Sequence, residues 1–362
     1  MTNTSKRLLN LVMVGDFGKD LDDEHALILA KGLERHGHFR LAGVIANLKP
    51  ADERARLAKG TLIALGDNDT PVAIGTAVFD GSQTAKYETS DYLAPRDCLV
   101  ESGREFFAQI LRDAEPQSLV VVLNSGMTDA FQALTDNPEL FAQKVARVAI
   151  MGGVEVDDNG DVKLDNEGRF QASIGRSGAA NNTFDDASAV GLYLKLQDLG
   201  VPTTVLMRWT AYACQVPFKI YDTMAQSGNI VGESLRGRQR PMLDNLWKSA
   251  NSAEGSEQRG KLPADRDRQW FVNTFCGGTD PVTDENVWAT VQGFQLYDGL
   301  NVVAAIDSLV ERFYEPVRIN VRGVEHLIIG PTAKNHGVKD IDALRTFLIE
   351  EETSAMTGSS AG

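Results

Sequence analysis

The feature that most constrains this chain is a short apolar run that ends in a dense group of acidic residues. Residues 11–14 are apolar, and positions 16–24 then contain four aspartates and one glutamate: Asp16, Asp20, Asp22, Asp23 and Glu24. A helical apolar pattern resumes at 26–29, so the stretch predicts a strand, an acidic loop and a helix.

Carboxylates gathered at the end of a buried strand repel one another and lose hydration. One or two of them could simply cap the following helix. Four exceed that need, and we expect a hard divalent cation bound through oxygen ligands. Asp298, predicted at a later strand end, would complete such a site, although for this residue alone an N-cap is the simpler interpretation.

Apolar runs alternate with helical patterns along the first half of the chain. Strand-like runs at 39–46, 71–74, 118–123 and 145–151 are separated by helical patterns at 23–35, 51–65 and 103–114. This alternation predicts an α/β fold with an open, mostly parallel β-sheet flanked by helices. Several strands end in polar or glycine-rich turns, and ligand crevices form at such ends of a parallel sheet.

The domain organisation follows from length and composition. The chain has 362 residues, of which 43% are hydrophobic, so we expect one α/β domain over 1–350 with a helical flank near 225–268. Residues 351–362 are interpreted as a flexible tail. Residues 154–180 are rich in Asp, Asn and Gly and predict an irregular insertion. Residues 157–168 do not match an EF-hand loop. Val162 stands at the sixth position, which needs glycine, and Gly168 at the twelfth, which needs glutamate.

Net charge restricts the partners. Thirty-six basic and 50 acidic residues give a net charge of -14, which disfavours nucleic acid and anionic membrane surfaces. A small-molecule ligand fits better, and a homo-oligomer stays open. Three widely spaced cysteines indicate neither a disulfide framework nor a zinc site. With no apolar run of membrane-spanning length, we expect a cytoplasmic protein.

A family resemblance arises from the acidic loop. The pattern Asp16-x-Gly18, two extra residues, then Leu21-Asp22-Asp23-x-x-Ala26-Leu27 resembles the amino-terminal DxDPGxDDxxAL signature of the calcium-dependent, inosine-uridine-preferring nucleoside hydrolases. Lys19-Asp20 is an insertion relative to that signature. The sequence DFGKDLDD is similar to that of the branch that includes the HopQ and XopQ effector proteins.

The resemblance continues in order over about residues 9 to 310. It includes the strand end at 44–47, the polar turn at 123–129, the MGG strand at 148–153, the helix start at 181–189, and Tyr297-Asp298 at the position of the family's His-Asp pair. Each match is weak alone, and their shared order carries the resemblance.

The resemblance implies residue roles and a calcium cofactor. Asp16, Asp23 and Asp298 would bind Ca²⁺ through carboxylates, and Thr128 through its main-chain carbonyl. Ribose would be held by Asp22, Asn47, Asn181 and Asn182. Asp16 would also accept the proton of the attacking water, while Tyr297 stands where the family has a histidine. Tyrosine is a poorer acid near neutral pH, since its ordinary pKa is about 10.

The implied activity is a calcium-dependent N-ribohydrolase that cleaves the N-glycosidic bond of a nucleoside or ribosyl derivative. Ala179 replaces a glutamate that clamps the sugar in the family. The alternatives are a nucleoside- or ADP-ribose-binding protein without turnover, and an interaction protein with a vestigial pocket. Arg208, Trp209, Arg266 and Arg268 could recognise a phosphate, although solvated surface arginine is the simpler interpretation for each arginine.

Overall fold

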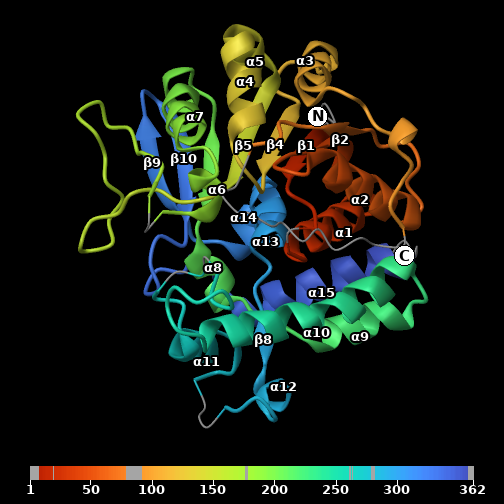
Figure 1. The fold of residues 1–362 in the computed structure, drawn as a ribbon. Coiled ribbons are helices and arrows are strands. Elements are labelled where there is room, and N and C mark those ends of the chain that lie inside the picture. Colours follow the sequence, from red (N-terminus) through yellow and green to blue (C-terminus); the bar gives the residue numbers. More distant parts are fainter. Residues whose placement is uncertain are drawn as a thin grey trace.

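The computed structural model describes residues 8–18, 20–78, 92–175, 178–260, 262, 264–278 and 282–357. Within these residues the main sheet has eight strands in the order β3-β2-β1-β4-β5-β6-β10-β9 (Figure 1). Every neighbouring pair in it is parallel except β10 with β9. The predicted open, mostly parallel sheet flanked by helices is therefore confirmed. The strands are β1 (Leu9–Gly15), β2 (Phe39–Ala46), β3 (Val72–Ile74), β4 (Leu119–Leu123), β5 (Val145–Met151), β6 (Thr203–Leu206), β9 (Val317–Val321) and β10 (Val324–Ile329), and a separate pair is formed by β7 (Val216–Pro217) and β8 (Gly293–Phe294).

Alternation along the strands divides the core into two layers. On β1, Leu11 and Met13 join one buried apolar cluster, while Val12 and Val14 join the other. Successive side chains of a strand point to opposite faces, so helices must cover both faces of this sheet. Helices α1 (Asp22–Arg35), α2 (Ala51–Ala64), α13 (Tyr297–Ala304) and α15 (Ile341–Thr357) contribute to the first cluster, and α3 (Gly103–Asp113), α4 (Thr128–Asp136), α5 (Pro138–Lys144) and α7 (Asp186–Asp198) to the second.

A group of helices extends from one end of the sheet (Figure 1). It consists of α8 (Arg208–Ala213), α9 (Lys219–Gln226), α10 (Ile230–Ala250), α11 (Arg268–Phe275) and α12 (Val287–Thr290), and the remaining elements are η1 (Arg96–Cys98), α6 (Ala180–Thr183) and α14 (Asp307–Phe313). A small apolar core of its own, with Trp247, Phe271 and Phe275, holds α10 and α11 together. The flank expected near 225–268 thus comprises the end of α9, all of α10 and the start of α11.

The prediction of a flexible tail is wrong for residues 351–357. They belong to α15, which packs against α1, and Glu351, Glu352, Ala355 and Met356 are buried. Residues 358–362 lie outside the described part of the chain. Among the described helices none is both long and apolar enough to cross a bilayer.

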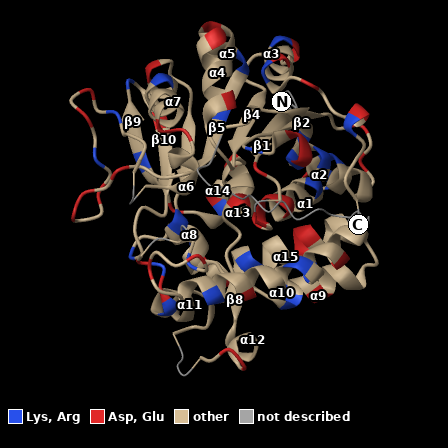
Figure 2. Ribbon diagram, viewed as in Figure 1, with Lys and Arg blue, Asp and Glu red and all other residues tan. Residues whose placement is uncertain are grey.

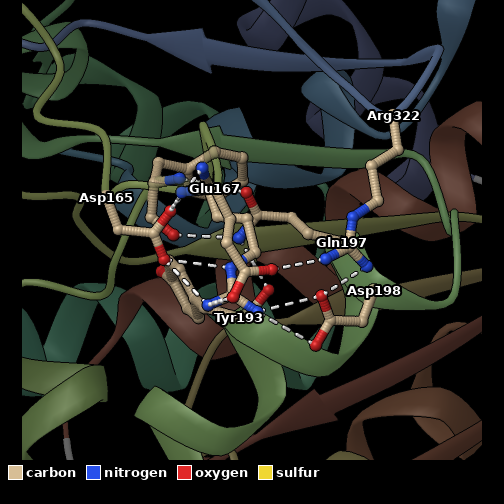
Figure 3. A network of polar contacts seen from close by, with 8 residues as sticks. Asp165, Glu167, Tyr193, Gln197, Asp198 and Arg322 are labelled. Atoms are coloured by element: carbon tan, nitrogen blue, oxygen red, sulfur yellow. Dashed lines mark hydrogen bonds and ion pairs between the residues drawn. The ribbon is translucent and has the colours of Figure 1, made fainter.

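The Asp/Asn/Gly-rich insertion forms a chain of small antiparallel bridges, Val154 with Ala172, Val156 with Val162, and Leu164 with Phe170. Figure 3 shows how polar side chains attach it to α7 and to the turn between β9 and β10. The network consists of Arg169 with Asp165 and Asp198, Arg322 with Glu167 and Asp198, and Gln197 with the main chain of Phe170. Residues 176 and 177, which lie within the predicted 154–180 insertion, are outside the described residues.

Candidate functional site

A cavity of about 320 Å³ lies where β1, β4 and β5 end. Its walls come from the turns after these strands, from the start of α1 and from the start of α13. Acidic positions gather where α1 and α13 meet (Figure 2). The lining residues are Asp16, Asp20, Asp22, Asp23, Asn124, Met151, Gly152, Ala179, Ala180, Asn181, Phe184, Arg208, Tyr212, Arg266, Tyr297 and Asp298. The carboxyl ends of parallel strands meet at one edge of a sheet, which explains this convergence.

Three carboxylates form the densest part of the site. Asp20, Asp22 and Asp23 each place one carboxylate oxygen within 4.8 Å of the other two. Burial, and then the charges of Asp20 and Asp298, raise the pKa of Asp22 well above its ordinary value. Burial also raises the pKa of Asp23, with the charge of Asp16 as the next cause. Asp23 is buried, whereas Asp22 is half-buried and Asp20 is exposed. Hard oxygen donors that repel one another at the wall of a cavity fit a hard divalent cation.

Gly15 allows one of these carboxylates to approach the backbone. Asp23 Oδ1 accepts a hydrogen bond from the main-chain N–H of Asp16 at 3.0 Å. A Cβ atom on Gly15 would lie 2.5 Å from that oxygen, so a larger residue at the end of β1 would displace the carboxylate. The glycine therefore fixes where the acidic loop folds back on the strand.

Asp20 has a place in the site that sequence reasoning missed. It was interpreted, with Lys19, as an insertion without a role, yet it lines the cavity and joins the carboxylate group. Lys19 lies outside the described residues. The sequence signal was the acidic density itself, since Asp20 is one of four aspartates within positions 16–23.

Arg54 is the second residue that was missed. It is buried, and its Nη1 donates to the carbonyl oxygen of Asp16 at 2.5 Å and to that of Phe17 at 3.1 Å. Its Nη2 donates to the carbonyl of Lys49 at 3.0 Å. Its charge also counteracts the raised pKa of Asp23. An arginine in the apolar stripe of α2, between Ala51 and Ala55, was the available signal.

Two asparagines connect α13 to β4. Asn301 Nδ2 donates to Asn124 Oδ1 at 2.8 Å and to the carbonyl of Leu123 at 3.2 Å. Asn124 Nδ2 in turn donates to the carbonyl of Asp298 at 3.4 Å. These bonds hold Asp298 against the end of β4. Asn301 was not predicted, because an asparagine inside an apolar helix carries no sequence motif.

The predicted sugar-binding residues fall into two groups. Asp22 and Asn181 line the cavity, and Asn181 Nδ2 donates to the carbonyls of Asn124 and Met151. Asn47 and Asn182 are fully buried and do not line it. Asn47 Nδ2 donates to the carbonyl of Gly126 and to a carboxylate, and Asn182 Nδ2 to the carbonyls of Gly153 and Ser173. They brace turns behind the cavity, and direct ligand contact stays a prediction for both.

The predicted metal ligands are also brought together unequally. Asp16, Asp23 and Asp298 line the cavity, and each is 4% exposed or less. Thr128 lies at the start of α4 and does not line it, while its hydroxyl donates to Asp185 Oδ2 at 2.6 Å. Its main-chain role as a ligand stays a prediction.

Tyr297 lines the same cavity as the carboxylates. Its ring lies 6.2 Å from that of Tyr212 in a T-shaped arrangement. Burial raises the pKa of Tyr297 well above its ordinary value, the neighbouring Tyr212 adds to this, and Arg266 opposes it. Near neutral pH the side chain is therefore a neutral phenol, which can donate a hydrogen bond.

Two further cavities adjoin the first. One of about 430 Å³ shares Gly152, Ala179 and Arg208 with it and is also lined by Lys163 and Trp209. The other, of about 500 Å³, shares Asp20, Asp22, Arg266 and Tyr297. Its other wall is largely apolar and comes mainly from α10 and α11, with Met242, Leu243, Leu246, Trp270 and Phe275. Arg268 lines none of the three, because its guanidinium bonds the carbonyl of Val282 and lies over Trp247.

The chain was compared with known proteins. No family model and no curated protein matches it. Among solved structures, type III effector XopQ, in complex with adenosine diphosphate ribose, has 29% identity and a TM-score of 0.78, over 97% of this chain and 94% of its own. Effector protein XOO4466 has 28% identity and a TM-score of 0.79, over 97% and 95%. The chain is therefore similar to XopQ-like effector proteins, and nucleoside hydrolases are among its structural neighbours.

More distant nucleoside hydrolases share the fold of this XopQ-like chain. A purine-preferring ribonucleoside hydrolase from Gardnerella vaginalis has 16% identity and a TM-score of 0.60, over 97% of this chain and 100% of its own. The likeness to XopQ and XOO4466, together with this shared fold, agrees with the resemblance found in the acidic loop.

Proposed function

We propose that the chain is a calcium-dependent N-ribohydrolase, which cleaves the N-glycosidic bond of a nucleoside or ribosyl derivative to a free base and a ribose product. The observation that carries the proposal is the meeting of Asp16, Asp22, Asp23, Asp298 and Tyr297 around one cavity at the carboxyl edge of the sheet. This set combines hard metal ligands with a donor that faces them. The structural likeness to nucleoside hydrolases supports it.

Asp16, Asp23 and Asp298 would hold calcium through carboxylates, with the main-chain carbonyl of Thr128. Their oxygen donors and mutual repulsion fit this ion. When bound, calcium supplies positive charge that makes water more acidic and orients neighbouring hydroxyl groups.

The remaining steps belong to side chains of this chain. An Asp16 carboxylate oxygen accepts the proton of the water that attacks the anomeric carbon. Asp22 accepts hydrogen bonds from ribose hydroxyls and stabilises the positive charge that develops on the sugar. The Tyr297 phenol donates a hydrogen bond to the departing base.

The cavity at Ala179 suggests the substrate class. Ala179 has no carboxylate to repel an anion, and Arg208 lines the same two cavities as it does. A guanidinium pairs well with phosphate. We therefore propose that the ribosyl ligand carries an anionic 5′ substituent, which the ADP-ribose complex of XopQ supports. The base would enter the apolar cavity beside α10.

Tyr297 also favours a second candidate function. Because the pKa of Tyr297 is raised, its phenol is a weak acid for leaving-group protonation. A protein that binds a nucleoside or ADP-ribose in the same calcium-ribose pocket without turnover is the alternative.

Free-base release measured over nucleosides, 5′-nucleotides and ADP-ribose, with calcium and with a chelator, separates the two functions. We expect release that the chelator abolishes and that Asp16→Asn lowers at least about a hundred-fold. Asp52→Asn serves as the control, because Asp52 is an exposed carboxylate on α2. Binding without release across the whole panel would establish the alternative and refute the hydrolase.

A further inference from the structure

We propose that the buried ion pair between Glu24 and Arg238 fixes α10 over the acidic loop and thereby sets the affinity for the base. Both are positioning residues, since neither lines the cavities described above. The part that concerns the base rests on the proposed function. The part that concerns the placement of α10 does not.

Glu24 connects the acidic loop to the helical flank. It follows Asp23 in α1 and is fully buried, and its Oε2 lies 2.6 Å from Arg238 Nη2 on α10. Tyr92 Oη donates to Glu24 Oε1 at 2.6 Å, and Arg238 Nη2 donates to Tyr92 Oη at 3.1 Å. The Arg238 side chain is only 11% exposed. Two opposite charges thus form a buried pair, and the Tyr92 phenol bonds to both of them.

The ion pair lies at the end of the wall that α10 gives to the apolar cavity. Arg238, Met242, Asn245 and Ser249 follow one another at helical spacings of four, three and four, so they share one face of α10. The last three line the cavity. The opposite wall includes Asp22, which lies two positions before Glu24. The ion pair therefore lies close to both walls of the cavity and helps to fix the distance between them.

A charge pair suits this role better than an apolar contact. A buried ion pair adds little net stability over well-packed apolar residues, but it is directional, and removing one partner leaves an uncompensated buried charge. Apolar contacts alone would leave the position of α10 relative to α1 less well defined. The pair instead favours one register of the flank.

The test compares Arg238→Met with Arg236→Met. Arg236 is on the same helix and pairs with Asp222 of α9 at 2.8 Å, but both side chains are more than half exposed, at 62% and 54%. Arg238→Met should speed amide hydrogen exchange across 239–250 at least about ten-fold, because α10 loses its buried anchor. Arg236→Met should match the wild type, and Arg238→Lys, which keeps the charge, should restore most of the protection.

Kinetics test the link to the base with the riboside that the wild type cleaves fastest. Arg238→Met should raise KM at least about ten-fold while kcat changes less than about three-fold, because the pair acts on binding. Calcium affinity by calorimetry should change less than about two-fold. Equal exchange in Arg238→Met and Arg236→Met would overturn the inference, as would equal losses in kcat and kcat/KM.

The two proposals can fail separately. A wild-type protein that neither binds nor cleaves any riboside contradicts the proposed function, whereas hydrogen exchange still decides whether the pair places α10. If Arg238→Met does not fold, Arg238→Lys decides: wild-type exchange supports the charge pairing, and fast exchange throughout α10 refutes it.

Discussion

Replacing Asp23 by asparagine should make the calcium-free protein more stable. Asp23 lies within 4.8 Å of the carboxylate oxygens of Asp20 and Asp22. Two unit charges at that distance repel by about 3.5 kcal/mol at an effective dielectric constant of about 20. Asparagine keeps the oxygen that accepts the hydrogen bond from the Asp16 N–H, so the substitution removes repulsion without removing this contact.

This gain in unfolding free energy corresponds to a change in melting temperature. A gain of up to about 3 kcal/mol, divided by an unfolding entropy of roughly 2.1 cal/mol/K per residue, raises Tm by up to about 4 °C. Wild-type protein should gain about 2.7 kcal/mol when calcium is present at about 100 times its Kd. Asp23→Asn should lose that gain, because a carboxylate ligand is missing.

The effect depends on pH with a definite sign. The pKa of Asp23 is raised in the folded protein, so the folded state holds this proton to higher pH than the unfolded state does. The contribution of Asp23 to the stability of the calcium-free wild type is therefore fully present below the unfolded pKa of about 4. It is lost as pH rises through the folded pKa. The advantage of Asp23→Asn should therefore be small at pH 4 and largest at pH 8.

Scanning calorimetry with a chelator and with calcium measures these quantities, and Asp52→Asn is again the exposed control. A lower Tm for Asp23→Asn than for wild type in chelator at pH 8 would refute the repulsion argument. A full calcium-dependent rise in the variant would refute the metal assignment.

Three further outcomes are expected. His326 is fully buried, and its ring has no hydrogen-bond partner among the described residues. Burial, aided by Arg147, lowers the pKa of His326 to about 4. In urea unfolding, the stability of the wild type should fall by up to about 3 kcal/mol between pH 6.5 and pH 4, whereas that of His326→Phe should not. Arg54→Met should lower the free energy of unfolding by about 3 kcal/mol in the same assay, because the buried carbonyls of Asp16 and Phe17 lose their hydrogen-bond donor. An unchanged urea midpoint would contradict this. Ala179→Glu should weaken ADP-ribose binding at least about ten-fold in calorimetry and leave the binding of a neutral riboside unchanged. Equal losses of affinity for the two ligands would contradict the placement of the anionic group beside Ala179.

The parts of the fold that the sequence predicted are those with local signals. All five residues of β4 are apolar and buried, and such a run has few alternatives to a central parallel strand. The acidic loop was found because four aspartates in so short a stretch exceed what capping needs. Local density and periodicity do not depend on the rest of the chain.

The misses depend on contacts between distant segments. The three glutamates at 350–352 were interpreted as part of a solvated tail. However, His36, directly after α1, contacts Glu351 at 2.7 Å, and His25 within α1 contacts Glu352 at 2.8 Å. Asn301 and Arg54 likewise look ordinary until the strands and helices that surround them are in place. A pattern of one residue type along the chain holds no information about a partner hundreds of positions away.

The contact between α1 and α15 has a consequence for synthesis. His25 and Glu352 are 327 positions apart, and Arg35 of α1 donates to the carbonyls of Ser354 and Ala355. The helix that bears the acidic loop thus lacks one of its packing partners until a segment 327 positions further along the chain has been made. Domains generally fold as units during synthesis, and contacts between distant segments form slowly. The acidic loop, although made early, therefore lies on a helix whose final packing depends on a segment made much later.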